Sequence, residues 1–172
     1  MSILIPAWVD GALTPVEKLE VHRRGLRHKA ISVFVMRGNE TLIQQRALTK
    51  YHTPGLWANA CCTHPFWDEA PLICAARRLE EELGISGLKL RRRHQVEYRA
   101  DVGSGLTEHE LVEIFTADAT KDMRITSNPN EVADTAWVDL DDLADLIKQH
   151  PERYTPWLRI YLADHMGSIF AA

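Results

Sequence analysis

The chain has 172 residues, of which 45% are hydrophobic and 26% charged, and its formal net charge is -4. This length and composition predict one globular domain over residues 1–172 with a sizeable core. A negative balance disfavours a nucleic-acid surface, and no apolar run reaches the roughly 18 residues of a membrane span. Three cysteines, two of them adjacent, are a poor disulfide framework, so we expect a reduced, cytoplasmic protein without nucleic-acid or membrane partners.

Strands and helices alternate irregularly along the chain. In order, the predicted elements are a strand at 3–9, a loop with a helical turn at 16–28, a hairpin of strands at 30–36 and 41–46, a loop at 47–55, a strand at 57–65, a helix at 70–83, strands at 87–100 and 108–117 separated by a turn at 101–106, a polar loop at 120–131, a strand at 135–138, and helices at 139–150 and from 155 or 156 onward. With no repeat and no linker, this pattern predicts an α/β (α+β) sandwich with a mixed sheet.

The segment from Trp57 to Pro65 concentrates chemically active side chains. Read as a strand, it places Ala60, Cys62 and His64 on one face, so a thiol and an imidazole lie side by side. Such a pair suits metal binding or proton transfer. Because free cysteines are among the most buried residues, simple core packing is an equally good interpretation of this segment alone.

The helix at 70–83 has clear end signals, with Pro71 in its first turn and Gly84 directly after it. Its opposite face is charged, and Arg78 and Glu82 are spaced to pair on a solvated surface. The residues expected to form the apolar stripe are Leu72, Ala76, Leu79 and Leu83.

The strand at 108–117 carries two acids on what reads as its apolar face. Alternation puts Glu108 and Glu110 on the same side as Val112 and Ile114. Buried like charges need a cation or a proton, so a buried acid pair indicates a functional site. Solvated acids at the start of a strand remain the alternative.

A metal site would explain these acids if the imidazoles converge on them. On base rates His22 and His28, in a basic segment, are more often solvated surface than ligands. With His64, Glu108 and Glu110 they would form a set suited to Zn²⁺, Mn²⁺ or Mg²⁺ in five- or six-fold coordination. Separately, Glu81 and Glu82 could hold Mg²⁺ that carries a phosphate-rich substrate, and the candidate diphosphate contacts are Arg46, Lys50 and Arg78.

Several segments match one known family in order and spacing. They are Asn59-Ala60-Cys61-Cys62-Thr63-His64-Pro65, Thr107-Glu108-His109-Glu110, Glu17-Lys18 before His22, His28 before the strand at 30–36, Arg46-Ala47-Leu48-Thr49-Lys50 with Pro54-Gly55-Leu56-Trp57, Tyr98-Arg99-Ala100, and Pro156-Trp157. Over residues 3–157 the chain resembles the type 1 isopentenyl-diphosphate Δ-isomerases of the Nudix-like superfamily. Thr63 stands where that family usually has Gly or Ser, which is a small steric change.

The helix at 70–83 also resembles a Nudix box, G-x5-E-x7-R-E-U-x-E-E-x-G-U with U apolar. Thr63 replaces the leading Gly, and Arg78 replaces the Glu that follows Arg77. These departures argue against ordinary Nudix hydrolysis, in which that Glu helps to hold the catalytic metals. The matching positions are Glu69, Arg77, Leu79, Glu81, Glu82, Gly84 and Ile85.

The resemblance implies a Nudix-like sandwich, with a mixed sheet between helices, that converts isopentenyl diphosphate into dimethylallyl diphosphate for isoprenoid biosynthesis. One alkene carbon is protonated, and a proton leaves the neighbouring methylene on the other face. Cys62 and Glu110 look like this acid–base pair, with Tyr98 assisting Glu110. Trp157 would stabilise the tertiary carbocation through its π face, by about 2 kcal/mol or more when desolvated. From the residues alone, core packing of Trp157 is the preferred interpretation.

The resemblance also implies two cation sites and an anion clamp. One Zn²⁺, Mn²⁺ or Mg²⁺ would be held by His22, His28, His64, Glu108 and Glu110. A second Mg²⁺, held by Glu82, would accompany the substrate diphosphate. The clamp would consist of Lys18, Arg46, Lys50 and Arg78, and we expect a monomer.

Three other functions fit the residues less well. A Nudix diphosphate hydrolase would need the Glu that is missing after Arg77. A structural zinc module built on Cys61, Cys62 and His64 lacks the C-x2–4-C spacing of such sites. A cysteine hydrolase using Cys62 and His64 lacks an evident third orienting group.

Overall fold

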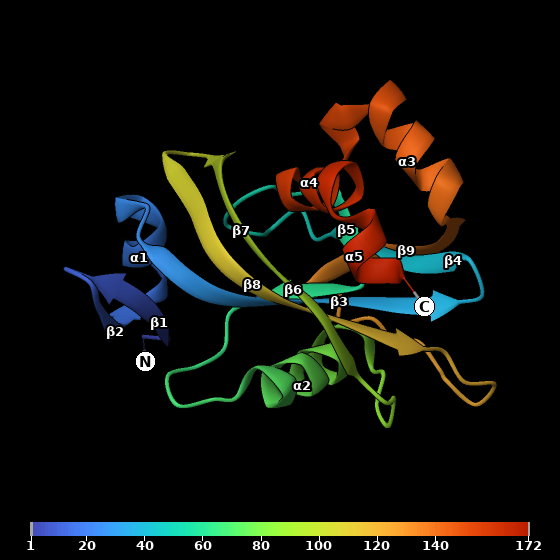
Figure 1. Ribbon diagram of the computed structural model, residues 1–172, viewed down its shortest axis with the longest axis horizontal. Coiled ribbons are helices and arrows are strands. Elements are labelled where there is room, and N and C mark those ends of the chain that lie inside the picture. Colours follow the sequence, from blue (N-terminus) through green and yellow to red (C-terminus); the bar gives the residue numbers. More distant parts are fainter. Residues whose placement is uncertain (1, 172) are drawn as a thin grey trace.

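A large mixed β-sheet runs through the middle of the molecule and has helices on both faces (Figure 1). The computed structural model describes residues 2–171. The strands of this part are β1 (Leu4–Val9), β2 (Ala12–Glu17), β3 (Arg27–Arg37), β4 (Glu40–Arg46), β5 (Trp57–Asn59), β6 (Cys61–Thr63), β7 (Arg91–Gly103), β8 (Leu106–Asp118) and β9 (Val132–Asp139). The helices are α1 (Lys18–Arg24), α2 (Pro71–Leu83), α3 (Leu140–Gln149), α4 (Pro156–Asp164) and α5 (Met166–Phe170), with a 3-10 turn at Pro151–Arg153. The predicted mixed sheet between helices is confirmed.

Strand β3 is the centre of the sheet. It runs parallel to β8 and antiparallel to β1, β4 and β6. Helix α2 covers one face of the sheet, while α3, α4 and α5 cover the other (Figure 1). Both faces are covered, and the middle of β3 is buried and apolar apart from Ser32: Ile31 and Val33 pack toward the α2 side, and Ala30 and Phe34 toward the α4 side.

The β7–β8 hairpin carries the predicted acid pair. Burial alternates along β8, and Glu108 and Glu110 are each 2% exposed, on the same side as Val112 and Ile114. The prediction of a buried acid pair is therefore confirmed, and the solvated alternative is wrong. Strand β7 runs to Gly103, so the turn is shorter than the predicted 101–106 segment.

The segment predicted as a loop with a helical turn at 16–28 is more ordered than expected: a helix is present, but little of the segment is a loop. It contains the end of β2, the whole of α1 and the start of β3. The Glu17 carboxylate accepts a hydrogen bond from the backbone N–H of Glu20, and Gly25 ends the helix with a φ of 62°. Gly25 is a helix-end signal that the sequence displays, whereas Glu17 is not one of the usual N-cap residues and its role is evident only from the structure.

The predicted stripe of helix α2 is only half right. Leu79 and Leu83 are buried as expected, but Leu72 is 49% exposed and Ala76 is also exposed. The buried face, where the helix packs on β3 and β6, instead includes Cys74, Ala75 and Glu82. The capping prediction holds: Gly84 adopts a φ of 65° directly after the helix.

Two further predicted elements are each divided in the structure. The strand at 57–65 is interrupted at Ala60 to give β5 and β6, and the helix predicted from 155 is divided into α4 and α5 at His165. Thr155 caps α4 by accepting a hydrogen bond from the backbone N–H of Leu158. Within residues 2–171 no helix is both long and apolar enough to cross a bilayer.

Candidate active site

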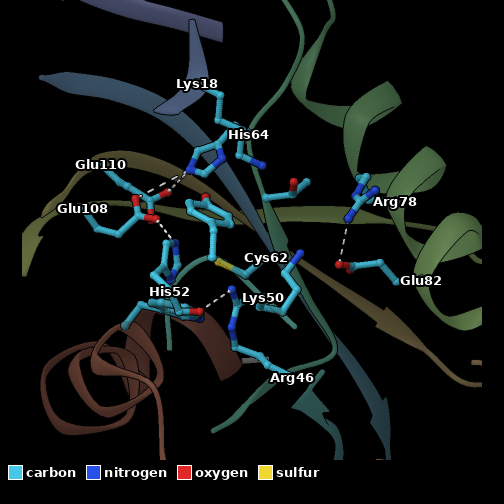
Figure 2. Close-up of a pocket in the computed structure, with 13 residues that line it drawn as sticks. Lys18, Arg46, Lys50, His52, Cys62, His64, Arg78, Glu82, Glu108 and Glu110 are labelled. Carbon is cyan, nitrogen blue, oxygen red and sulfur yellow. Dashed lines mark hydrogen bonds and ion pairs between the residues drawn. The ribbon is translucent and has the colours of Figure 1, made fainter. Parts of the chain in front are cut away.

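One cavity gathers most of the residues singled out in the sequence (Figure 2). It lies between the β8 acids and helix α2, with Cys62 between the two groups (Figure 2). Its predicted lining residues are Lys18, Arg46, Lys50, Cys62, His64, Arg78, Glu82, Glu108, Glu110 and Trp157. The lining also includes Tyr51, His52 and Thr63, for which the sequence predicts no role. The three other predicted site residues, His22, His28 and Tyr98, are bonded to the two β8 acids.

Imidazoles surround the carboxylate of Glu108. His22 Nε2 lies 2.9 Å from Oε1, and His28 Nε2 lies 3.0 Å from Oε2. His64 Nε2 lies 3.6 Å from Glu108 Oε2 and 3.5 Å from Glu110 Oε2. His22 and His28 are completely buried, so their interpretation as solvated surface residues is wrong.

Backbone carbonyls orient two of these rings. His22 Nδ1 lies 2.6 Å from the Lys18 carbonyl oxygen, and His28 Nδ1 lies 2.7 Å from the Leu26 carbonyl oxygen. A carbonyl only accepts, so Nδ1 carries a proton in each ring, and the neutral form of such a ring has its Nε2 lone pair available for a metal at the centre. Metal-binding imidazoles commonly have this arrangement, in which one ring nitrogen binds the metal and the other donates its N–H to a carbonyl.

Several buried polar atoms between the imidazole rings and the two acids lack hydrogen-bond partners, and they indicate a site for a cation. Both ring nitrogens of His64 and Oε2 of Glu110 are buried without a hydrogen-bond partner in the described part of the chain. Lone pairs and carboxylate oxygens that face one another repel unless a cation lies among them. The donor atoms of His22, His28, His64 and Glu108 all lie within 4.8 Å of one another. The residues therefore fit a divalent metal with mixed nitrogen and oxygen ligands.

Glu108 is expected to be ionised, as a metal ligand must be. Burial raises the pKa of its carboxyl, but the surrounding imidazoles, those of His22 and His28 first, hold that pKa well below its ordinary value. Glu108 is therefore an anion at neutral pH, in a place where an isolated buried anion would be very costly.

Two candidate proton-transfer groups lie in this region. Tyr98 donates a hydrogen bond to Oε1 of Glu110, and burial raises the pKa of the Tyr98 hydroxyl well above its usual value. Cys62 Sγ lies 3.0 Å from Ser32 Oγ, which in turn lies 2.9 Å from the Tyr161 hydroxyl. Burial, and then the charge of Glu110, raise the pKa of the Cys62 thiol, which is therefore neutral near pH 7.

The two adjacent cysteines have different surroundings. Cys62 lines the cavity, while Cys61 is completely buried in the core between the sheet and α2. The period of two along β6 separates them, since neighbouring side chains in a strand point to opposite faces. Core packing is thus the right interpretation for Cys61, and Cys62 is the one open to the cavity.

The cavity has a cationic end, where three predicted clamp residues meet an acid that was not predicted. Lys50 Nζ lies 2.5 Å from Glu131, and Arg78 lies 2.9 Å from Glu82 and 3.5 Å from Glu131. Burial, then the charges of Lys50 and Arg78, lower the pKa of Lys18 to about 8. Nothing in the polar loop at 120–131 distinguishes Glu131 in the sequence.

Arg46 is more deeply engaged than a simple anion contact. Its Nε donates to the Thr53 carbonyl at 3.2 Å, and one terminal nitrogen donates to the His52 carbonyl at 3.1 Å. The guanidinium also lies 5.3 Å from the centre of the Trp157 ring. Arg46 therefore braces the loop after β4 as well as facing the cavity.

A fold with this sheet, this helix and this cavity is that of a NUDIX protein, and the NUDIX domain family matches residues 26–159. The chain belongs to this family and, within it, to the isopentenyl-diphosphate Delta-isomerases. Curated relatives with that name include one from Dinoroseobacter shibae, 66% identical over 99% of this chain and 97% of the relative. Another, from Ruegeria pomeroyi, is 56% identical over 99% of this chain and 94% of the relative.

Solved structures agree on the fold. A protein from Deinococcus radiodurans superposes with a TM-score of 0.73 over 93% of this chain and 96% of its own, at 13% identity. A MutT NUDIX hydrolase from Burkholderia pseudomallei superposes with a TM-score of 0.62 over 81% of this chain and 98% of its own, at 24% identity. At these identities the likeness concerns the architecture alone.

Proposed function

We propose that this cavity isomerises isopentenyl diphosphate to dimethylallyl diphosphate by adding one proton to the substrate and removing another. The observation that carries the proposal is the meeting of Cys62 and the Tyr98–Glu110 pair at a cavity with a cationic end. The carbon skeleton needs an acid and a base, and the diphosphate needs the cations. The names of relatives at 56–67% identity support the same reaction.

Glu110 is the proposed source of the proton that reaches the terminal alkene carbon, and this step leaves a tertiary carbocation. Tyr98 assists by holding Oε1 of Glu110. Cys62 then takes the proton from the neighbouring methylene, which forms the new double bond. Cys62 accepts this proton as the thiolate, so the resting thiol first loses its own proton to solvent, and a proton returns to Glu110 before the next turnover. The two groups exchange roles in the reverse direction.

Trp157 is proposed to stabilise the carbocation. It is 2% exposed and lines the cavity, and its indole Nε1 has no hydrogen-bond partner within residues 2–171. A desolvated cation over an indole face gains about 2 kcal/mol or more. Substrate that fills the cavity would also displace water and so protect a carbocation from capture.

A divalent cation, Zn²⁺, Mn²⁺ or Mg²⁺, would be held by His22, His28, His64, Glu108 and Glu110. When bound, it supplies positive charge that makes the Glu110 carboxyl a stronger acid. A second Mg²⁺, held by Glu82, would accompany the diphosphate. The diphosphate itself would be bound by Lys18, Arg46, Lys50 and Arg78.

Hydrolysis of a diphosphate is the rival function on this fold, and Arg78 argues against it. In the place of a metal-binding Glu, this helix presents a guanidinium paired with Glu82 and Glu131. Glu81 is 45% exposed and paired with Arg77 and Arg78. Of the charged residues on this helix, only Arg78 and Glu82 line the cavity, so the cavity receives one cation and one acid from it.

The test is to incubate the purified protein with isopentenyl diphosphate and Mg²⁺ and to follow acid-labile allylic diphosphate and free phosphate separately. Allylic product without phosphate is expected. Phosphate without allylic product would overturn the proposal in favour of a hydrolase. We further propose that the protein acts as a monomer in the cytoplasm, since one chain supplies the whole cavity and its three cysteines are free.

A further inference from the structure

We propose that His52 is a positioning residue of the metal centre, which holds the Glu108 carboxylate in place by a hydrogen bond from its Nε2–H. The inference rests on the metal centre of the proposed function and adds a residue to it. His52 Nε2 lies 2.7 Å from Oε1 of Glu108, and its ring is 4% exposed. Nε2 is buried and no hydrogen bond of regular geometry is formed by it within residues 2–171, so Oε1 of Glu108, at 2.7 Å, is the acceptor that a small rotation of the ring would engage.

His52 differs from the proposed ligand imidazoles in the group that contacts its Nδ1 atom. His22 and His28 have a backbone carbonyl at Nδ1, which forces the proton onto that nitrogen. His52 has the Thr53 hydroxyl at Nδ1 instead, at 2.8 Å. A hydroxyl can donate as well as accept, so it permits the proton to be on Nε2. An ionised carboxylate 2.7 Å away only accepts, and it favours this tautomer of His52.

The location of His52 agrees with a supporting role. His52 is outside the group of donor atoms, those of His22, His28, His64 and Glu108, that lie within 4.8 Å of one another. It contacts the oxygen of Glu108 that is also near His22, while His28 and His64 are near the other oxygen. Figure 2 shows His52 on the opposite side of Glu108 from His64. His52 therefore contacts the Glu108 carboxylate from the side that faces away from His64.

The backbone is strained where it turns His52 inward. Thr53 has a φ of 45°, which is a costly conformation for a β-branched residue. Arg46 holds this turn through the carbonyls of both His52 and Thr53. Strain that surrounding contacts maintain is a mark of functional geometry, and here its visible result is the imidazole at Glu108.

The experiment measures Mn²⁺ affinity of the full-length, metal-stripped protein from the electron paramagnetic resonance signal of free Mn²⁺. His52→Phe fills the same space without a donor, and His52→Gln restores an N–H donor. We expect His52→Phe to weaken Mn²⁺ binding by about 10- to 100-fold, the usual effect of losing a group that orients a ligand. His52→Gln should bind more tightly than His52→Phe. His94→Ala, which removes an imidazole paired with His165 away from the cavity, should bind like the unchanged protein.

Two results would overturn the inference. One is unchanged Mn²⁺ affinity in His52→Phe. The other is a Co²⁺ spectrum in His52→Phe that shifts to a lower coordination number, because His52 would then be a ligand. His64→Ala tests the metal centre itself: if this variant loses Mn²⁺ binding while His52→Phe keeps it, only the role of His52 is lost. If His64→Ala binds normally, the proposed centre fails and this inference fails with it. Circular dichroism of each variant checks that it is folded.

Discussion

Tyr98 and Glu110 are direct cross-strand partners in the β7–β8 ladder, and the Tyr98 hydroxyl donates a hydrogen bond to Oε1 of Glu110. The other carboxylate oxygen, Oε2, lies 3.5 Å from His64 Nε2. The Glu110 carboxylate is thus held at Oε1 by the Tyr98 hydroxyl, while its Oε2 faces the imidazole of His64. This division suits a group that must keep a fixed orientation while its proton is moved.

Tyr98→Phe should lower kcat by roughly 10- to 100-fold, because a hydrogen bond to a charged group contributes about 1.5–3 kcal/mol. Steady-state formation of allylic product measures the effect. Tyr154→Phe changes a buried tyrosine outside the cavity and should stay close to the unchanged rate. Equal rates for both variants would remove Tyr98 from the mechanism.

Cys62→Ala should leave the fold intact and lower kcat by about 10²–10⁴-fold, the range for losing one general acid or base. The matched control is Cys74→Ala, since Cys74 is completely buried in α2 and does not line the cavity. A Cys62→Ala variant with near-normal turnover would show that the thiol does not transfer a proton.

Glu110→Gln should lose activity and bind the divalent metal more weakly, because it removes an anionic ligand and an acid together. Elemental analysis of the purified variant measures the metal content. Glu113→Gln, on the same strand but paired with Arg92 outside the cavity, should retain both. Full metal content in Glu110→Gln would contradict its role as a ligand.

The pH dependence of kcat/KM should fall above about pH 8, where Lys18 loses the proton that attracts diphosphate. The folded-state pKa of Lys18 lies below the ordinary value of 10.5, so the unfolded chain binds more protons between the two values. In this window Lys18 makes stability rise with pH while activity falls. Lys18→Arg should move the fall in kcat/KM to higher pH; an unmoved profile would assign the fall to another group.

Glu131→Gln should bind inorganic diphosphate more tightly without Mg²⁺, because the Glu131 carboxylate occupies Lys50 and Arg78. The expected gain is about 3- to 10-fold, equivalent to roughly 1 kcal/mol for releasing a charge pair. Isothermal titration calorimetry measures it. Weaker binding would instead indicate that Glu131 helps to hold the ligand.

Periodicity within one element was readable from the sequence. The alternation along β8 correctly predicts that Glu108 and Glu110 are buried beside Val112 and Ile114. Gly84 correctly predicts the end of α2. These features depend on backbone geometry over a few residues, so a short stretch of sequence contains the information. The same kind of pattern predicted the buried face of α2 only in part, because Leu72 and Ala76 fit the helical period but are exposed in the structure.

Contacts between elements were decided by the tertiary structure. The sequence determined which residue types were available, and motif spacing determined the family they resemble. Only the parallel register of β3 with β8 sets His28 opposite Glu110, and only the path of the loop after β4 brings His52 to Glu108. Such contacts join residues 56–82 positions apart in the chain. They depend on which buried faces pack together across the whole molecule, a free-energy balance that no local pattern contains.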